Sequence, residues 1–237
     1  MRLPWPANIV QGPGEKSKHP TAVRPEGAEE MPQSTRLGDV RIRDVRPLIS
    51  PALPQGDHPA DDAVQAFIER SRGEVADVVH GRDRRLLGVV GPCSTPDAAQ
   101  AMESAHRLRA LADALRDDLL VVMRVYFEKP RTTVGWKGFI NDPRLDGSFR
   151  INEGLRLARG LLLDIARLGL PAGTEFLDLL SPQYIADLIS WGAIGARTTE
   201  SPSHRQVASG LSCPIGFKNG TDGRVDVAAD GLGACSA

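Results

Sequence analysis

The strongest constraint on the fold is a repeated alternation of short apolar segments and helical segments along residues 86–234. The apolar segments predict strands at residues 86–90, 119–126, 174–177, 192–196 and 214–218. The first of them ends at Gly91-Pro92 and is apolar along its whole length, as expected of a parallel strand that is buried on both faces. Because a helical segment follows each strand, the pattern predicts consecutive β/α units with right-handed crossovers.

The helical segments are predicted from the spacing of their apolar residues. Ala98, Met102 and Ala105 begin a repeat of three and four residues, and Thr95 with Pro96 is expected to start this helix. Further helices are expected at residues 61–80, 155–168, 182–190, 203–209 and 225–234. Residues 129–149 are expected to form a long loop after the second strand, and long loops in compact domains often carry function.

Two folds accommodate consecutive β/α units, a doubly wound open sheet and a closed (β/α)8 barrel. No Gly-x-Gly-x-x-Gly fingerprint follows the first strand, and charged residues recur at strand ends, which favours the TIM barrel with its active site at those ends. A full barrel needs eight units and about 250 residues. We therefore expect an α/β fold of the TIM-barrel family, here a partial barrel of only about five units after Leu86.

The chain divides into three predicted regions. Residues 1–36 are rich in Pro, Gly, Lys and Glu without periodicity, so they are expected to form a disordered N-terminal tail. Residues 37–84 are expected to form an N-terminal arm and helix, with a possible short strand at residues 40–42 and irregular backbone around the prolines between positions 47 and 59. Residues 85–237 are expected to form the N-terminal part of the barrel domain, incomplete at its C-terminus.

Composition excludes several classes of protein. With 237 residues, 41% hydrophobic, 25% charged and a net charge of -1, the chain is typical of a globular protein, and its basic residues are local, so nucleic acid is not expected as a partner. No apolar stretch of about 18 residues predicts a membrane span, and prolines interrupt any secretory signal. Three cysteines do not make a disulfide framework, so a cytoplasmic location is expected.

Cations recur where the predicted strands give way to loops. Arg124 interrupts an apolar run, where a charge requires a partner or a bound oxyanion. Lys129 and Arg131 follow closely, and Arg197 and Lys218 come at the ends of the fourth and fifth strands. Because the carboxyl ends of parallel strands meet at one edge of a sheet, this recurrence is typical of a phosphate-binding pocket.

Each of these residues also has a purely structural interpretation. Arg124 and Lys218 could each be paired with a carboxylate such as that of Glu175, and Lys129 is in a loop where exposed charge is common. A lone cysteine such as Cys93 is more often a small buried hydrophobic residue than a metal ligand. Residue types and spacing alone leave these alternatives open.

Several long strings match a known family in order: GPCS at residues 91–94, MRVYFEKPRTTVGWKGFIND at 123–142, EFLD at 175–178, WGAIGARTTES at 191–201 and LSCPIGFKNGTDG at 211–223. From about residue 38 onward the chain resembles the bacterial class I 3-deoxy-D-arabino-heptulosonate 7-phosphate (DAHP) synthases, which include feedback-regulated enzymes. The resemblance implies a TIM-barrel transferase that condenses phosphoenolpyruvate with erythrose 4-phosphate and releases phosphate. This reaction is the first step of the shikimate pathway to chorismate and the aromatic amino acids.

The resemblance also implies roles for individual residues. Phosphoenolpyruvate would be bound by Arg124, Lys129, Ala196, Arg197 and Lys218, with Glu175 lining the same pocket. Erythrose 4-phosphate would be bound by Arg131 and Thr132, and Lys129 and Arg124 are the expected catalytic residues. Cys93 would be one ligand of a divalent metal, manganese or iron, that polarises the aldehyde. The family's other ligands, a His, a Glu and an Asp, are absent from this sequence.

Two interpretations of the chain follow. The first is a synthase truncated after about its fifth barrel unit, and the second is a non-catalytic fragment that at most binds phosphorylated ligands or pairs with another chain. Because the metal site is incomplete, negligible turnover is expected of this chain alone. The resemblance further implies an aromatic amino-acid effector near Asp39 and Ser212, and homo-oligomers.

Overall fold

A computed structural model describes residues 38, 41–42, 44–131 and 135–236. The chain divides into two compact units, Met1–Arg46 and Pro47–Ala237. In the first unit the described Arg41 and Ile42 are not part of a strand, so the short arm strand expected at residues 40–42 is wrong for these two positions. The tail expected at residues 1–36 lies outside the described residues.

The second unit contains a parallel sheet in which the spatial order of the strands equals their order along the chain, β1-β2-β3-β4-β5. The strands are β1 (Leu86–Val90), β2 (Leu119–Arg124), β3 (Ala172–Phe176), β4 (Trp191–Ile194) and β5 (Ile215–Phe217). The expected parallel α/β architecture is therefore confirmed. Successive strands always add on the same side, as in a barrel, whereas a doubly wound sheet reverses direction partway.

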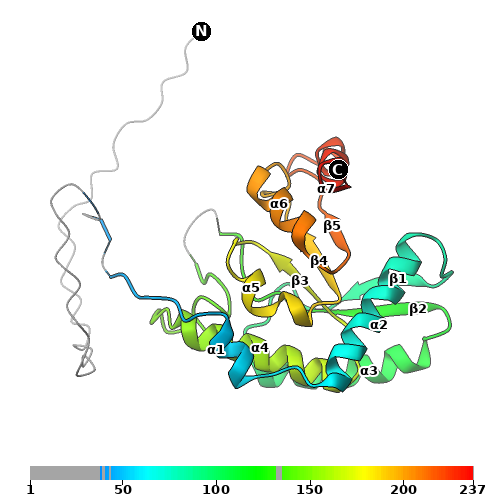
Figure 1. Cartoon of the computed structure of the whole chain (residues 1–237), viewed down its shortest axis with the longest axis horizontal. Coiled ribbons are helices and arrows are strands. Elements are labelled where there is room, and N and C mark those ends of the chain that lie inside the picture. Colours follow the sequence, from blue (N-terminus) through cyan, green and yellow to red (C-terminus); the bar gives the residue numbers. More distant parts are fainter. Residues whose placement is uncertain (1–37, 39–40, 43, 132–134, 237) are drawn as a thin grey trace, which may run out of the picture. The chain divides into compact units, whose positions relative to one another are not determined.

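Helices connect the strands and pack along the sheet, with α3 and α4 against β2 and β3, and α7 against β5 (Figure 1). Their bounds are α1 (Ala52–Asp57), α2 (Asp62–Val79), α3 (Ala98–Ala114), α4 (Ile151–Arg167), α5 (Pro182–Ile185) with a following 3-10 turn η1 (Ala186–Leu188), α6 (Pro202–Gly210) and α7 (Asp226–Ser236). No helix in the described ranges is long and apolar enough to cross a membrane.

Three local predictions differ from the structure. Helix α3 is capped by Asp97, whose carboxylate accepts a hydrogen bond from the Gln100 amide at 2.8 Å, whereas Thr95 is buried before the helix. Helix α1 forms within the segment expected to be irregular, because Pro51 and Pro54 occupy the helix start, where a missing N–H costs nothing. The helix expected at residues 182–190 ends at Leu188 and is partly 3-10.

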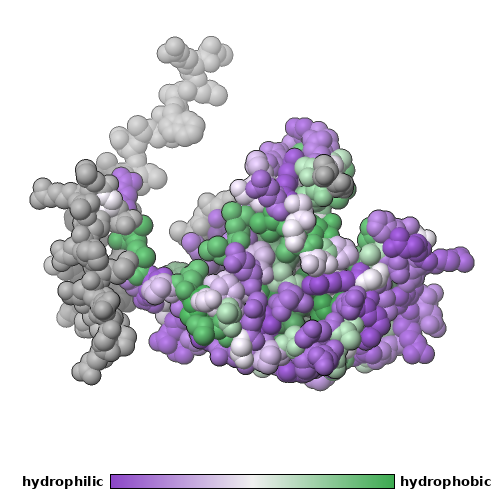
Figure 2. Space-filling model, in the orientation of Figure 1, coloured by the Kyte–Doolittle hydropathy of each residue, from purple (hydrophilic) through white to green (hydrophobic). Residues whose placement is uncertain are grey.

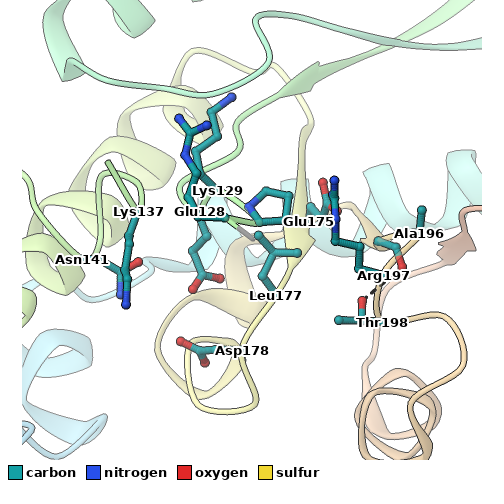
Figure 3. A pocket seen from close by; sticks show the side chains of 13 residues that line it. Glu128, Lys129, Lys137, Asn141, Glu175, Leu177, Asp178, Ala196, Arg197 and Thr198 are labelled. Carbon is teal, nitrogen blue, oxygen red and sulfur yellow. Dashed lines mark hydrogen bonds between the residues drawn. The ribbon is translucent and has the colours of Figure 1, made fainter. Parts of the chain in front are cut away.

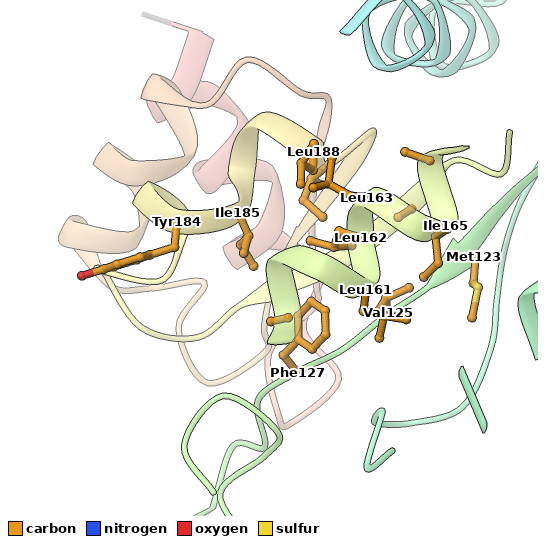
Figure 4. Close-up of a cluster of buried hydrophobic side chains, with 14 of the residues drawn as sticks. Met123, Val125, Phe127, Leu161, Leu162, Leu163, Ile165, Tyr184, Ile185 and Leu188 are labelled. Carbon is orange, nitrogen blue, oxygen red and sulfur yellow. The ribbon is translucent and has the colours of Figure 1, made fainter. Parts of the chain in front are cut away.

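The hydrophobic core lies between the sheet and α4. One face of α4 contributes Leu155, Leu162 and Ile165, which pack with Met123 of β2 and with Phe127 beyond its end (Figure 4). Short parallel strands buried on both faces need such a covering helix, because every second side chain points toward it. This packing holds the carboxyl end of β2, where the cationic residues begin.

Arg159 is an unusual member of this core, because it is a charged residue only 2% exposed. Its guanidinium makes two hydrogen bonds to the Asp187 carboxylate, at 2.7 and 2.8 Å. It also donates to the backbone oxygens of His58 and Tyr184, both at 2.9 Å. These partners satisfy the buried charge, and they join α4, η1 and the segment after α1.

Apolar side chains are exposed at both edges of the sheet, near β1 and near β5. On β1, Leu86 is 70% exposed and Val90 is also exposed, and near β5 the exposed residues are Val225 and Leu232 of the α7 region. Hydrophobic surface is visible below α7 in Figure 2. An edge strand with exposed apolar residues offers a surface on which further structure can pack.

Candidate active site

A pocket of about 280 Å³ lies at the carboxyl ends of β3 and β4 and against the loop that follows β2. Its lining combines cationic, acidic and small residues (Figure 3): Glu128, Lys129, Pro130, Arg131, Lys137, Asn141, Glu175, Leu177, Asp178, Gly195, Ala196, Arg197 and Thr198. Of the residues expected at the site, Lys129, Arg131, Glu175, Ala196 and Arg197 line this pocket.

The loop after β2 is held in place by a short antiparallel bridge between Glu128 and Gly138. The Lys129 amide donates to the Lys137 carbonyl at 2.9 Å. Gly138 has a φ of 117°, and a Cβ there would overlap the Phe127 carbonyl, so only glycine fits this crossing. The bridge therefore fixes the direction in which Lys129 leaves the sheet.

Arg124 and Lys218 lie beside the pocket and meet at one aromatic ring. The Arg124 Cζ atom is 4.5 Å and the Lys218 Nζ atom 5.2 Å from the centroid of the Tyr126 ring. Tyr126 itself is only 4% exposed. Burial, followed by the negative charge of Glu175, raises the pKa of the Tyr126 hydroxyl to about 12.

Within the described ranges, Lys218 forms an ion pair and Arg124 does not. The Lys218 Nζ atom donates to Glu175 Oε2 at 2.8 Å, and Glu175 is 8% exposed. Gly195 makes room for this carboxylate, because a Cβ at position 195 would overlap Glu175 Oε1. Arg124 has a buried Nε atom without a hydrogen-bond partner, and no carboxylate pairs with it in the described part of the chain. The ion-pair alternative thus holds for Lys218 alone.

Cys93 is exposed and lies beside Lys129, so it is not the small buried residue of the structural alternative. The Lys129 Nζ atom is 3.2 Å from Cys93 Sγ and 3.4 Å from its carbonyl oxygen. This hydrogen bond is the main reason that the pKa of the Cys93 thiol is lowered, against the opposing effect of desolvation. A thiol that ionises readily is suited to bind a metal or to react as a nucleophile.

One thiolate does not make a metal site. Among the described residues there is no group of three or more His, Cys, Asp or Glu side chains that could hold a metal ion. Metal sites that include a cysteine thiolate, such as those of zinc, use three or four protein ligands. The residues present therefore do not fit a complete metal centre, and Cys93 is at most one contributor.

The remaining cations of the pocket differ in their contacts. Arg131 donates from Nε to the Trp136 carbonyl at 2.9 Å, which ties it to its own loop. The side chains of Arg197 and Lys137 make no hydrogen bond or ion pair within the described ranges, although both line the pocket. Thr132, expected to act with Arg131, lies outside the described residues. Unpaired cations around a pocket favour an anionic ligand.

Sequence reasoning missed an acidic pair in the same pocket. Glu128 is 8% exposed, its Oε2 atom accepts from the Ser181 hydroxyl at 3.2 Å, and its carboxyl group lies near that of Asp178 (Figure 3). Burial, then the charge of Asp178, raises the pKa of Glu128 to about 8. The available signal was that Glu128 and Asp178 each lie just beyond the end of a predicted strand.

The site thus contains two neighbouring groups of residues. The first is the lining of the pocket, and the second consists of Cys93, Arg124, Tyr126 and Lys218. Lys129 and Glu175 join them, because each lines the pocket and also contacts a residue of the second group, Cys93 or Lys218. Charge therefore extends continuously from the pocket to the ring of Tyr126.

Comparisons with known proteins agree in one family. Residues 60–236 match the model of the DAHP synthetase I family. The Phe-sensitive phospho-2-dehydro-3-deoxyheptonate aldolase of Escherichia coli (strain K12) is 57% identical over 199 residues, which are 84% of this chain and 57% of the relative. The Tyr-sensitive aldolase of Salmonella typhimurium (strain LT2) is 54% identical over 204 residues, which are 86% and 57% of the two chains.

A solved structure supports the same relationship. The phospho-2-dehydro-3-deoxyheptonate aldolase of Francisella tularensis SCHU S4 superposes with a TM-score of 0.80 at 53% identity, covering 81% of this chain and 57% of the other. The expected fold family is thereby confirmed, with five parallel strands forming a partial barrel. The chain spans a little over half the length of the curated relatives it matches. It belongs to the DAHP synthetase I family.

Proposed function

We propose that the chain carries the phosphoenolpyruvate-binding part of a 3-deoxy-7-phosphoheptulonate synthase. The observation that supports this best is that cations from the ends of three strands lie at one edge of the sheet. Arg197 lines the pocket, whereas Arg124 and Lys218 lie over the ring of Tyr126, and Lys218 contacts the pocket residue Glu175. Phosphoenolpyruvate carries a phosphate and a carboxylate, and Arg and Lys are the side chains that bind such groups most strongly. The relatives from Escherichia coli and Salmonella typhimurium are phospho-2-dehydro-3-deoxyheptonate aldolases.

In the proposed reaction, C3 of phosphoenolpyruvate forms a bond with the aldehyde carbon of erythrose 4-phosphate. Water adds to C2, the bond between C2 and the phosphate oxygen breaks, and inorganic phosphate leaves. Arg124, Arg197 and Lys218 would hold the anion and stabilise charge on the leaving phosphate. Lys129 would hold or donate a proton near the new hydroxyl group. Arg131 and Thr132 would bind the second phosphate, and Ala196 would line the first site.

Cys93, whose thiol has a lowered pKa, is the one residue of the chain that we propose as a ligand of a divalent metal, manganese or iron. When bound, such a metal would polarise the aldehyde. Because the described residues do not form a complete metal centre, none of the roles above depends on it. An aromatic effector near Ser212 is proposed from the Phe- and Tyr-sensitive relatives; Asp39 lies outside the described residues. A cytoplasmic, homo-oligomeric enzyme also stays a prediction.

Calorimetric titration of the chain with phosphoenolpyruvate tests the proposal. We expect saturable binding that weakens about 30-fold in Arg197→Ala, since charge-assisted hydrogen bonds contribute about 2 kcal/mol each. Arg107→Ala is the matched control, because Arg107 is exposed on α3, pairs there with Glu103 and does not line the pocket. Equal affinity in all three proteins, or no binding to the unsubstituted chain, would contradict the proposed function.

A second function is favoured by the exposed apolar residues of β1 and α7, namely a non-catalytic chain that pairs with another chain. Turnover separates the two functions. With both substrates and saturating manganese, the chain alone is expected to show negligible synthase activity, whereas rates comparable to those of a full-length relative would rule out the second function.

A further inference from the structure

We propose that Tyr126 is a positioning residue of the phosphoenolpyruvate site, whose ring holds Arg124 and Lys218 together through cation–π attraction. The inference deepens the proposed function and rests on it. It starts from the two distances to the ring centroid, 4.5 Å for the Arg124 Cζ atom and 5.2 Å for the Lys218 Nζ atom. Both lie within the range of about 6 Å over which an aromatic ring attracts a cation.

Two cations that must bind one multiply charged anion repel each other when the ligand is absent. Carboxylates can hold such cations, but each carboxylate removes one positive charge from the site. Glu175 already offsets Lys218, and a second carboxylate beside Arg124 would cancel the remaining charge of these two cations. An aromatic ring attracts both cations through its quadrupole and adds no net charge, so the site keeps its attraction for an anion.

The ring is well placed for this role because the backbone around it is fixed. The Tyr126 carbonyl accepts a hydrogen bond from the Thr95 amide at 2.9 Å, and the amide of the preceding Val125 donates to the Gly173 carbonyl at 2.8 Å. Tyr126 is also buried. A fixed ring just beyond the end of β2 is therefore within cation–π distance of both the cation of its own strand and the cation that follows β5.

The competing explanation is that Tyr126 only fills space in the core. The two explanations differ in what they predict for the electronic character of the ring at constant shape. Fluorine atoms withdraw electron density and weaken the negative face of a phenylalanine ring, yet they change its size little. Cation–π attraction falls with each added fluorine, whereas packing does not.

The test uses the 237-residue chain with Tyr126→Phe as reference, and with mono-, di- and trifluorophenylalanine at the same position. Phosphoenolpyruvate is titrated into each protein by calorimetry. We expect the logarithm of Kd to rise steadily with fluorine number, to about tenfold weaker binding for the trifluoro ring. Tyr126→Leu, which removes the ring, is expected to bind at least as weakly as the trifluoro protein.

The matched control is the same fluorinated series at Phe127. Phe127 is buried next to Tyr126, packs on Phe139 at a centroid distance of 6.0 Å, and has no cation over its ring among the described residues. Its series should leave Kd unchanged. Melting temperatures measured for both series separate loss of folding from loss of binding.

The outcomes distinguish the two levels of the proposal. A flat series at position 126 in a chain that still binds phosphoenolpyruvate overturns the role of Tyr126 and leaves the proposed function standing. A trend of equal size at Phe127 also overturns it, because the effect would then come from packing. Absence of binding to the unsubstituted chain overturns both.

Discussion

Arg124 and Arg159 both lie in apolar surroundings, but their guanidinium groups differ in how many hydrogen-bond partners the protein supplies. Arg159 is 2% exposed, and its guanidinium is satisfied by the Asp187 carboxylate and two backbone carbonyls. Among the described residues, Arg124 has a buried Nε atom without a hydrogen-bond partner, and its guanidinium lies against the ring of Tyr126 and near the thiol of Cys93, with no carboxylate paired to it. The protein itself supplies the hydrogen-bond partners of Arg159, whereas Arg124 retains donor groups that a bound anion could use.

This difference separates structural charge from functional charge. A buried charge without partners is costly, so it persists where a ligand supplies what the protein omits. Saturated pairing, as at Arg159, indicates a role in holding helices together. Incomplete pairing at the carboxyl end of a strand, as at Arg124, supports the proposed anion site. The predictions below test this separation.

The largest effect is expected at Lys129, on the functional side. Lys129→Met, introduced at the matching position of a full-length relative, should lower turnover about 10⁴-fold, because the proposed proton-transfer group is lost. The melting temperature should change little, since the side chain is only half-buried and its contact is the neighbouring Cys93. Steady-state kinetics and thermal unfolding check both parts, and near-normal turnover would contradict the assignment.

Glu128 extends the comparison to a buried carboxyl group that forms no ion pair among the described residues. Burial raises its pKa from the usual 4.5 to about 8, so between these pH values the folded chain holds a proton that the unfolded chain has released. The stability this proton provides is complete below about pH 4.5 and is lost as the pH rises toward 8, by up to about 5 kcal/mol. Glu128→Gln should remove this pH dependence.

Urea unfolding at pH 5, 6, 7 and 8 measures the effect. Glu103→Gln is the control, because Glu103 is exposed on α3 and should leave the slope with pH unchanged. A free energy of unfolding that is as flat in the parent chain as in Glu128→Gln would show that the carboxyl group is not protonated when buried.

Asp187, the carboxylate partner of Arg159, provides a test of the structural role given to that arginine. Asp187→Ala would leave the Arg159 guanidinium buried with only its two carbonyl partners, at an expected cost of about 3 kcal/mol in the free energy of unfolding. Phosphoenolpyruvate affinity, measured by calorimetry below the melting temperature, should not change. A loss of affinity without a loss of stability would reverse the roles given to the two arginines.

Arg124 gives the smallest expected effect, about 2 kcal/mol, and it should appear in binding and not in stability. Arg124→Ala should weaken phosphoenolpyruvate binding about 30-fold and lower the free energy of unfolding by less than about 1 kcal/mol, since no ion pair is broken. Calorimetry and urea unfolding of the same preparation measure both. A large loss of stability would mean that Arg124 is structural after all.

Much of the fold could be predicted because its signals are local. All five strands begin and end within two residues of their expected bounds, since each is a short apolar run bounded by charges or turns. The position of Thr95 before Pro96 predicts a helix cap, but Asp97 directly precedes α3 and its carboxylate accepts the capping hydrogen bond. The prolines between positions 47 and 59 predict irregular backbone, but α1 forms there because proline is compatible with a helix start.

The site was only partly predictable, since it depends on which strand ends meet in space. Residue types alone could not decide whether Glu175 pairs with Arg124 or with Lys218; the structure pairs it with Lys218. The ring of Tyr126 and the Glu128–Asp178 pair became visible only when the ends of separate strands were brought together.

The fit of Glu175 against Gly195 makes the electrostatics of this region depend on a position that bears no charge. A single methyl group there would displace the carboxylate and release the ammonium group it holds. The pocket would then become more cationic although every ionisable residue was retained. An inventory of acids and bases would miss such a change, because it arises from the shape of the backbone alone.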